Sequence, residues 1–489
     1  MNHTMLERIN MHTTLSLGVL LLSGAAGAST VLYEVQELLA DDPAQYGGYG
    51  SEVSLDGDTL VVCAPGNDTY GLDAGICWVL TRDWSGAFSE QQVIVGSDIA
   101  WFERFGYSAT VHGDLMVIGA RAKVVDGLVD AGAVYVFERM SGTWQETAIL
   151  TAPVPQQGAV YGWSVDTDGE SIIVGARMTD NELGAAWVYV QDSTGDWEVQ
   201  GTLMGDIIDE GDQFGFSVAI QGDTALAGAP YVNTCGGNNR CGGVVVFQRD
   251  GTTWSQSEML VPDDIAYEDY FGWDCDLDEE ADRIVATSIY DDTNGNQSGC
   301  GYIWDLQNGS WVQTAKLLPS DGETQDQCGK QCEIDGDMVV ISSWYGNDDK
   351  GEAWAWQLNG DAWTEVAMLR ASDGGGTDIF GRSVTLDGET AVVGADWHDV
   401  VPADDDNAGA AYVYDLAMVS LPTGACCTNG TCIAATSGDC DLFGGTYQGD
   451  GADCADFDCG DDCAADVDGD GVVAVDDLLE VIGAWGLCP

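Results

Sequence analysis

The pattern of apolar and polar residues repeats seven times along the chain. Each copy has an apolar run such as residues 116–120, an acidic loop, and a second apolar run such as residues 133–137. An aromatic-Gly pair opens most copies, with the glycine at Gly50, Gly106, Gly162, Gly215, Gly272, Gly329 and Gly381. A period of roughly 50 to 60 residues holds about four strands and their turns. The pattern therefore predicts one four-stranded antiparallel sheet per repeat.

The second apolar run of each copy is apolar on both faces. In the second copy, Val134 and Val136 point to one side of the strand, and Tyr135 and Phe137 point to the other. Such a strand must be covered on both sides, and a ring of radially stacked sheets provides that cover while protecting the sheet edges. We therefore predict an all-β fold, a seven-bladed β-propeller of four-stranded blades over residues 29–416.

The two ends of the repeat array are complementary. Residues 33–41 match the fourth strand of later copies, such as residues 311–318, but no first three strands precede them. The seventh copy stops after Tyr414 without a fourth strand. We expect the N-terminal strand to complete the last blade and close the ring.

Two sets of residues recur in this array. A tryptophan precedes the fourth strand in five copies, and at blade spacing it is expected to be a packing residue rather than a sugar platform. The loops between the second and third strands vary most and carry acids, so they are candidate binding or calcium positions. The tryptophans are Trp144, Trp197, Trp254, Trp311 and Trp363. The acids are Asp68 with Asp73, Asp126 with Asp130, Asp291 with Asp292, Asp348 with Asp349, and Asp404, Asp405 and Asp406.

The N-terminus and the charge indicate an exported protein. Residues 1–28 read as a secretory signal, with an apolar run too short to span a bilayer and a small-residue cleavage site. The formal net charge is −67, and such a surface repels nucleic acid and anionic membranes. We predict an extracellular, secreted or cell-surface protein with no nucleic-acid partner and no membrane span.

The cysteine count agrees with export. Of the 16 cysteines, eight lie in the propeller and eight after residue 420, so each part has an even number to form disulfides. We expect pairing of Cys63 with Cys77 and of Cys235 with Cys241, and no free thiol. The sequence leaves open how four further cysteines pair; these are Cys275, Cys300, Cys328 and Cys332.

The composition changes past a linker at residues 417–423. Residues 424–460 form a small Cys-rich segment in which disulfides replace a core, and residues 461–489 contain an acidic Asp-x-Asp-x-Asp-Gly run. Hard oxygen ligands at this spacing bind Ca²⁺. The predicted calcium ligands are the side chains of Asp466, Asp468 and Asp470, the carbonyl of Val472, and the side chain of Asp477.

The repeat resembles a known family. Its aromatic-Gly start, its Gly-Asp turn and the Gly-Ala-Pro at residues 228–230 are similar to the FG-GAP repeats of integrin α-subunit propellers and of secreted bacterial proteins. The calcium loop often found in integrin repeats is missing from turns such as residues 55–58, so those sites do not carry over. Residues 424–460 resemble Cys-rich modules of secreted planctomycete proteins. Residues 461–489 resemble a single-loop dockerin flanked by cysteines, which implies attachment to a cohesin-like or cell-surface partner.

These features favour a non-catalytic function. The leading hypothesis is an adhesion scaffold whose propeller loops recognise a protein or glycan partner and whose calcium-loaded tail tethers it to an extracellular assembly. The alternative is an extracellular enzyme acting on polysaccharide, a lyase or a glycosidase. No catalytic or cofactor-binding residue stands out, and the chain after the signal has only His112 and His398. A single pocket that gathers carboxylates with a Lys, Arg or Tyr would favour the enzyme.

Overall fold

The computed structural model describes two units, a β-propeller and a small C-terminal sheet. The described residues of the propeller are 30–40, 47–237, 239–278, 282–346, 350–376, 378–399 and 407–419, and those of the C-terminal part are 424–428, 431–435, 440, 446–450 and 454. The signal sequence and all five predicted calcium ligands of the tail lie outside these ranges. Within them, none of the helices is long and apolar enough to cross a bilayer.

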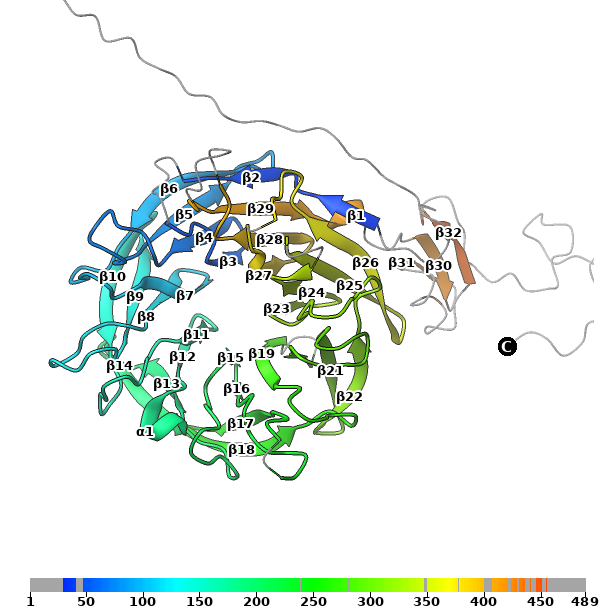
Figure 1. The fold of residues 1–489 in the computed structure, drawn as a ribbon. Helices are drawn as coiled ribbons and strands as arrows, with labels where there is room; N and C mark the ends of the chain where they lie inside the picture. The colour runs from blue at the N-terminus through cyan, green and yellow to red at the C-terminus, as the bar shows by residue number, and fades with distance from the viewer. Residues whose placement is uncertain are drawn as a thin grey trace, which may run out of the picture. The chain divides into compact units, whose positions relative to one another are not determined.

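Seven antiparallel sheets surround a central axis, one for each repeat (Figure 1). The first three blades contain β3 (Glu52–Asp56), β4 (Thr59–Ala64), β5 (Ile76–Arg82) and β6 (Phe88–Ile94); β7 (Phe105–His112), β8 (Leu115–Ala120), β9 (Ala133–Met140) and β10 (Thr143–Leu150); and β11 (Ser164–Thr167), β12 (Ser171–Ala176), β13 (Ala185–Gln191) and β14 (Trp197–Leu203). A four-residue element, α1 (Thr179–Glu182), lies between β12 and β13.

The other four blades follow the same order. They contain β15 (Val218–Gln221), β16 (Thr224–Gly228), β17 (Val244–Asp250) and β18 (Thr253–Leu260); β19 (Phe271–Asp278), β20 (Arg283–Ser288), β21 (Cys300–Gln307) and β22 (Ser310–Leu317); β23 (Cys332–Asp335), β24 (Met338–Ser343), β25 (Glu352–Asn359) and β26 (Ala362–Arg370); and β27 (Phe380–Asp387), β28 (Thr390–Ala395) and β29 (Ala410–Asp415), which η1 (Leu416–Met418) follows. The predicted seven-bladed architecture is confirmed.

The N-terminal segment joins two blades. Strand β2 (Gln36–Leu38) pairs antiparallel with β29 and supplies the missing fourth strand of the last blade, as predicted. Strand β1 (Thr30–Tyr33) pairs parallel with β26, on the outer edge of the sixth blade. The sequence did not predict this second contact. Ring closure therefore extends across two neighbouring sheets.

The third strand of each blade is buried on both faces, as its composition predicts. Tyr135 and Val134 on β9 are fully buried, although they point to opposite sides of the sheet. Tyr135 belongs to a core shared by the first and second blades, and Val134 to a core shared by the second and third. Adjacent blades thus cover one another, which is the main source of hydrophobic stabilisation in a ring.

Two series of glycines allow the blades to approach closely. The glycine after each aromatic has a positive φ, for example 86° at Gly106, a backbone conformation that glycine adopts without strain. A second series, not recognised from sequence, precedes the third strand. In it, Gly132 has a φ of 86° and bridges to Tyr161 of the next blade. A Cβ at Gly132 would overlap the Tyr161 carbonyl oxygen, so the blades meet here through backbone.

Carboxylates of the innermost strands also link neighbouring blades. Five aspartates at the end of an innermost strand, or directly after it in the case of Asp168, accept a hydrogen bond from the turn glycine of the next blade, over 2.5–3.1 Å. The pairs are Asp56 with Gly113, Asp168 with Gly222, Asp278 with Gly336, Asp335 with Gly388, and Asp387 with Gly57. The pair that spans Asp387 and Gly57 joins the last blade to the first.

The cysteines follow the predictions in part. Cys63 bonds to Cys77 across β4 and β5, and Cys235 bonds to Cys241 within one loop, as predicted. Four buried propeller cysteines are free thiols, so the expectation of complete pairing is wrong there. In the C-terminal unit, β30 (Gly424–Thr428), β31 (Thr431–Ala435) and β32 (Thr446–Asp450) form a sheet, and Cys426 bonds to Cys440.

Candidate functional site

A central channel of about 600 Å³ is lined by the innermost strands of all seven blades. The first residue after each repeated glycine lies where the innermost strand begins, at the edge that also carries the loops between second and third strands. These seven residues are Ser51, Tyr107, Trp163, Phe216, Trp273, Lys330 and Arg382. Four aromatic side chains in consecutive blades are therefore followed by two cations.

The residues that directly follow the second strands interleave with this series. The guanidinium carbon of Arg121 lies 4.3 Å from the ring centre of Tyr107 and 5.5 Å from that of Trp163. Arg177 lies 3.8 Å from Trp163 and 5.2 Å from Phe216. Cation–π attraction of about 0.5–2 kcal/mol holds each such pair. The first half of the ring thus alternates aromatic and cationic side chains.

The second half continues the arrangement. Phe216 and Trp273 have ring centres 4.7 Å apart. Trp344 lies between two cations, 5.2 Å from the Lys330 Nζ and 5.9 Å from the Arg382 guanidinium carbon. Arg382 then forms an ion pair of 3.4 Å with Asp396. We call this set the mouth ring; it comprises Tyr107, Arg121, Trp163, Arg177, Phe216, Trp273, Lys330, Trp344 and Arg382.

Three cations of the mouth ring have no carboxylate partner among the described residues. Arg121, Arg177 and Lys330 make no ion pair there, and the Nε atoms of both arginines are buried without a hydrogen bond. Burial lowers the pKa of both arginines. For Lys330, burial and then repulsion by Arg382 lower the pKa to about 8. By contrast, cations such as Arg139 and Arg249 lie against aspartates on the rest of the propeller.

Below the mouth ring the channel is acidic. Burial raises the pKa of Glu52 to about 7, an effect that the positive charge of Arg382 opposes. Burial likewise raises the pKa of Asp166 to about 7 and that of Asp276 to about 8. Both aspartates accept a backbone N–H from the next blade, that of Ile220 for Asp166 and that of Ile334 for Asp276. The channel therefore brings carboxylates, cations and tyrosines into one cavity.

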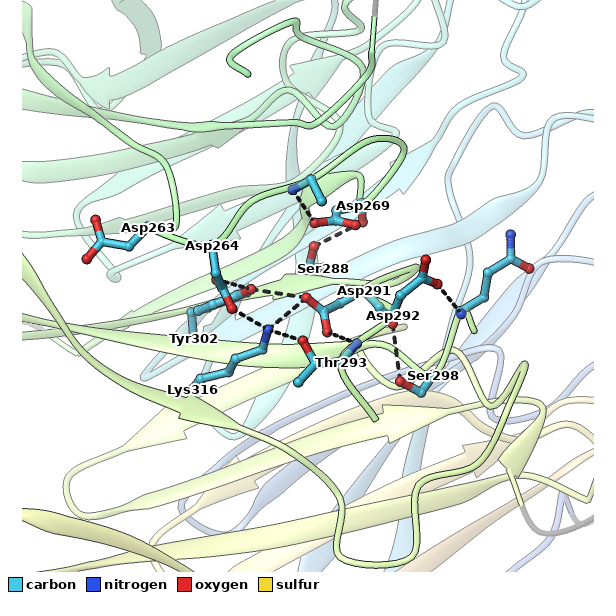
Figure 2. A network of polar contacts seen from close by, with 12 residues as sticks. Asp263, Asp264, Asp269, Ser288, Asp291, Asp292, Thr293, Ser298, Tyr302 and Lys316 are labelled. Atoms are coloured by element: carbon cyan, nitrogen blue, oxygen red, sulfur yellow. Dashed lines mark hydrogen bonds and ion pairs between the residues drawn. The ribbon is translucent and has the colours of Figure 1, made fainter. Parts of the chain in front are cut away.

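In one acidic loop that was expected to bind a partner or calcium, the two aspartates bond to groups of the protein itself. Asp291 is only 3 % exposed and accepts hydrogen bonds from Lys316 at 2.8 Å and from the Thr293 N–H (Figure 2). Asp292 caps its own loop by accepting the Gln297 N–H. A lysine thus already supplies positive charge beside Asp291.

The remaining loop acids are partly described. Asp68 accepts the N–H of Asp73 at 2.7 Å, which shapes the loop. Asp126 and Asp130 both have a φ of 53°, in the left-handed region. The other predicted acids, Asp348 with Asp349 and residues 404–406, lie outside the described residues, as do Asp466, Asp468, Asp470, Val472 and Asp477.

Four of the five recurrent tryptophans pack as predicted. Trp144 is 3 % exposed and belongs to a blade core, and Trp311 belongs to another. Trp197 and Trp254 are partly buried against two further cores. The aromatic residues of the channel were not recognised from sequence. Their signal was the position after the repeated glycine, which aligns all seven copies.

Comparison with known proteins identifies the repeat. The model of the FG-GAP repeat matches residues 33–80, 88–137, 144–189, 197–247, 254–304, 311–355 and 363–414. Each match begins near a fourth strand and ends within the third strand of the following blade, so a sequence repeat spans two blades. No curated protein matches the chain significantly. The seven matches cover most of the chain, which therefore belongs to the FG-GAP repeat family.

Proposed function

We propose that this protein is an exported, non-catalytic binding scaffold that recognises an acidic glycan at the mouth ring. The observation that carries the proposal is a set of three cations, Arg121, Arg177 and Lys330, that lie against aromatic rings and make no ion pair among the described residues. In a chain of net charge −67, cations are scarce. Cations held without a carboxylate partner are available to a ligand that brings its own negative charge.

The chemistry of the mouth ring suits a sugar. Aromatic faces pack against apolar surface, including the C–H faces of sugar rings. Arg side chains bind carboxylate or sulfate through paired N–H donors, and Lys binds them as a point charge. A cavity of about 600 Å³ also falls in the size range of sites for small ligands or short oligomers. A protein partner that inserts acidic side chains is the competing occupant.

Support for the tether comes from sequence alone. The Asp-x-Asp-x-Asp-Gly run at residues 466–471 has the ligand spacing of a calcium loop. In the proposed arrangement, the calcium-loaded tail attaches the protein to an extracellular assembly or a cell surface, and the propeller presents the mouth ring to its ligand. Calcium titration of the chain, with Asp466→Ala and Asp470→Ala variants, tests this part separately.

One observation favours an enzyme as the second candidate. Glu52 and Lys330 lie in the same cavity, and the pKa of each is shifted toward neutrality, to about 7 and about 8. Groups with such pKa values suit proton transfer, as a lyase or glycosidase requires. Binding remains the first candidate because these cations lie against aromatic rings, an arrangement that suits an acidic sugar.

The experiment is a screen of the mature protein against uronate-containing, sulfated and uncharged polysaccharides, together with an array of acidic peptides. The proposal expects binding to the charged polysaccharides and none to the uncharged ones. Binding only to peptides would assign the mouth ring to a protein partner. Release of new chain ends over time would establish the enzyme instead.

A further inference from the structure

A polar cluster recurs at the loop edge of four blades. In the fifth blade, Lys316 lies 2.7 Å from Asp264 and 2.8 Å from Asp291 (Figure 2). The Tyr302 hydroxyl, from the third strand, donates to Asp264. In the second blade, Lys123 lies between Asp98 and Glu103 at 3.0 and 3.1 Å. In the sixth, Arg370 contacts Asp321 and Glu352.

In these three blades, one permanent cation contacts two carboxylates. Each set of one cation and the two carboxylates it contacts therefore carries a net charge of −1. The aromatic residue of the third strand holds the first carboxylate in place, through Tyr135, Tyr302 or Trp354. The cluster is thus a structural unit of the repeat, and its arrangement requires a positive charge near the first aspartate.

The seventh blade departs from this arrangement. Tyr412 donates to Asp373 at 3.0 Å, as its counterparts do, but the basic residue of this cluster is His398, at the loop position that Lys123 has in the second blade. Three carboxylates surround the imidazole, those of Asp373, Asp378 and Glu37. Glu37 comes from β2, the N-terminal strand that closes the ring. A neutral histidine would leave this cluster at −3, and a protonated one at −2.

The two ring nitrogens of His398 face all three carboxylates. The ring is 6 % exposed, and its Nδ1 lies 2.9 Å from Asp378. Its Nε2 lies 3.8 Å from the Glu37 Oε1 and 3.7 Å from the Asp373 Oδ2, beyond hydrogen-bond range. The ligand atoms of all three residues lie within 4.8 Å of one another. Ligands of a tetrahedral zinc ion are about 3.4 Å apart, given bonds of about 2.1 Å.

We infer that Glu37, Asp373 and His398 bind a divalent transition metal ion of the zinc type, which fastens the N-terminal strand to the last blade. One imidazole nitrogen and two carboxylate oxygens suit zinc better than calcium, which takes oxygen ligands only. Asp378 accepts a hydrogen bond from the Nδ1–H of His398 and so presents Nε2 to the ion, an arrangement common for metal-bound histidine. With a divalent ion and a neutral imidazole, the net charge of the His398 cluster changes from −3 to −1.

The test is zinc binding by the full mature chain after treatment with a chelator. Calorimetry with Zn²⁺ and separately with Ca²⁺ gives stoichiometry, and thermal unfolding reports stabilisation. Hydrogen exchange of residues 36–38 reports whether the ion fastens β2. Comparison of variants is essential because the free thiols and the many acidic side chains of the chain offer other metal ligands.

The His398→Asn variant is expected to bind one zinc ion fewer than the wild type and to lose zinc-dependent protection of residues 36–38. The Glu37 side chain is partly exposed, and Glu37→Gln keeps its shape. This variant is expected to weaken zinc binding at this site at least tenfold, so the test stands even if His398→Asn folds poorly. His112→Asn, the matched control on β7, is expected to behave as wild type. Equal zinc affinity and equal protection of residues 36–38 in the wild type and Glu37→Gln would overturn the inference.

Discussion

Arg177 lies with its guanidinium carbon 3.8 Å from the centre of the Trp163 ring, and Arg121 lies 5.5 Å from the same ring. Neither arginine has a carboxylate partner among the described residues, in a protein whose acids far outnumber its bases. Because both guanidinium groups pack against one indole ring, positive charge and an apolar face lie together at this edge of the channel. This juxtaposition is the basis of the proposed ligand site.

The glycines between blades give the first prediction. Gly132→Ala adds a Cβ that overlaps the carbonyl oxygen of Tyr161 in the next blade, whereas Gly142→Ala adds one to open space. Both glycines have a φ near 85°, at 86° and 82°, so the backbone strain of about 1–2 kcal/mol is common to both variants. We expect Gly132→Ala to cost at least about 2 kcal/mol more in chemical denaturation. Equal losses would mean that the blades separate easily here.

Ring closure gives the second prediction. A chain that starts at residue 41 lacks β1 and β2 and loses the buried side chains of Leu32 and Leu38. Each is worth roughly 1.5–3 kcal/mol, so the free energy of unfolding should fall by about 3–6 kcal/mol relative to a chain that starts at residue 29. Thermal unfolding at the same temperature for both chains would show that the N-terminal strands do not close the ring.

The sequence predicted the fold but not the mouth ring. The repeat of apolar runs and the spacing of Gly50 to Gly381 predicted seven blades, because burial on both faces is a local property of each strand. The parallel pairing of β1 with β26 was missed, because it joins segments over 300 residues apart that share no pattern. The mouth ring was missed for a related reason: Arg121 and Trp163 come from different copies, and only the closed ring brings them together.

The four free cysteines give the third prediction. Burial raises the thiol pKa of Cys275, Cys300, Cys328 and Cys332, and only the thiolate reacts with alkylating reagents. In the unreduced protein, these four should resist alkylation when folded and react after denaturation, as peptide mass spectrometry would detect. Cys63 and Cys77 should react only after reduction. A disulfide-linked peptide that contains Cys275 or Cys300 would contradict the assignment.

The acidic channel gives a pH prediction. Asp276 has a pKa raised to about 8 by burial, above its ordinary value, so the folded state binds its proton more tightly than the unfolded state does. Its contribution to stability is therefore fully present below about pH 4 and is lost as the pH rises through about 8. We expect Asp276→Asn, compared with wild type, to gain about 1–2 kcal/mol in relative stability between pH 5 and pH 9, an amount reduced by channel water.

The control for this pH dependence is Asp126→Asn, on an exposed loop of the second blade. Its stability relative to wild type should stay nearly constant over the same pH range. If Asp276→Asn also runs parallel to wild type from pH 5 to pH 9, the carboxyl group is ionised in the folded protein throughout.

The most direct test of the central claim is calorimetric titration of the mature protein with an oligouronate, for the wild type, Arg177→Gln and Arg139→Gln. Arg139 is the matched control, since it lies 5.1 Å from the Trp144 ring but is paired with Asp114. A hydrogen bond to a charged group contributes about 1.5–3 kcal/mol, so the account predicts at least a tenfold weaker affinity for Arg177→Gln and an unchanged affinity for Arg139→Gln. Equal affinity in all three proteins, or no binding by the wild type, would contradict it.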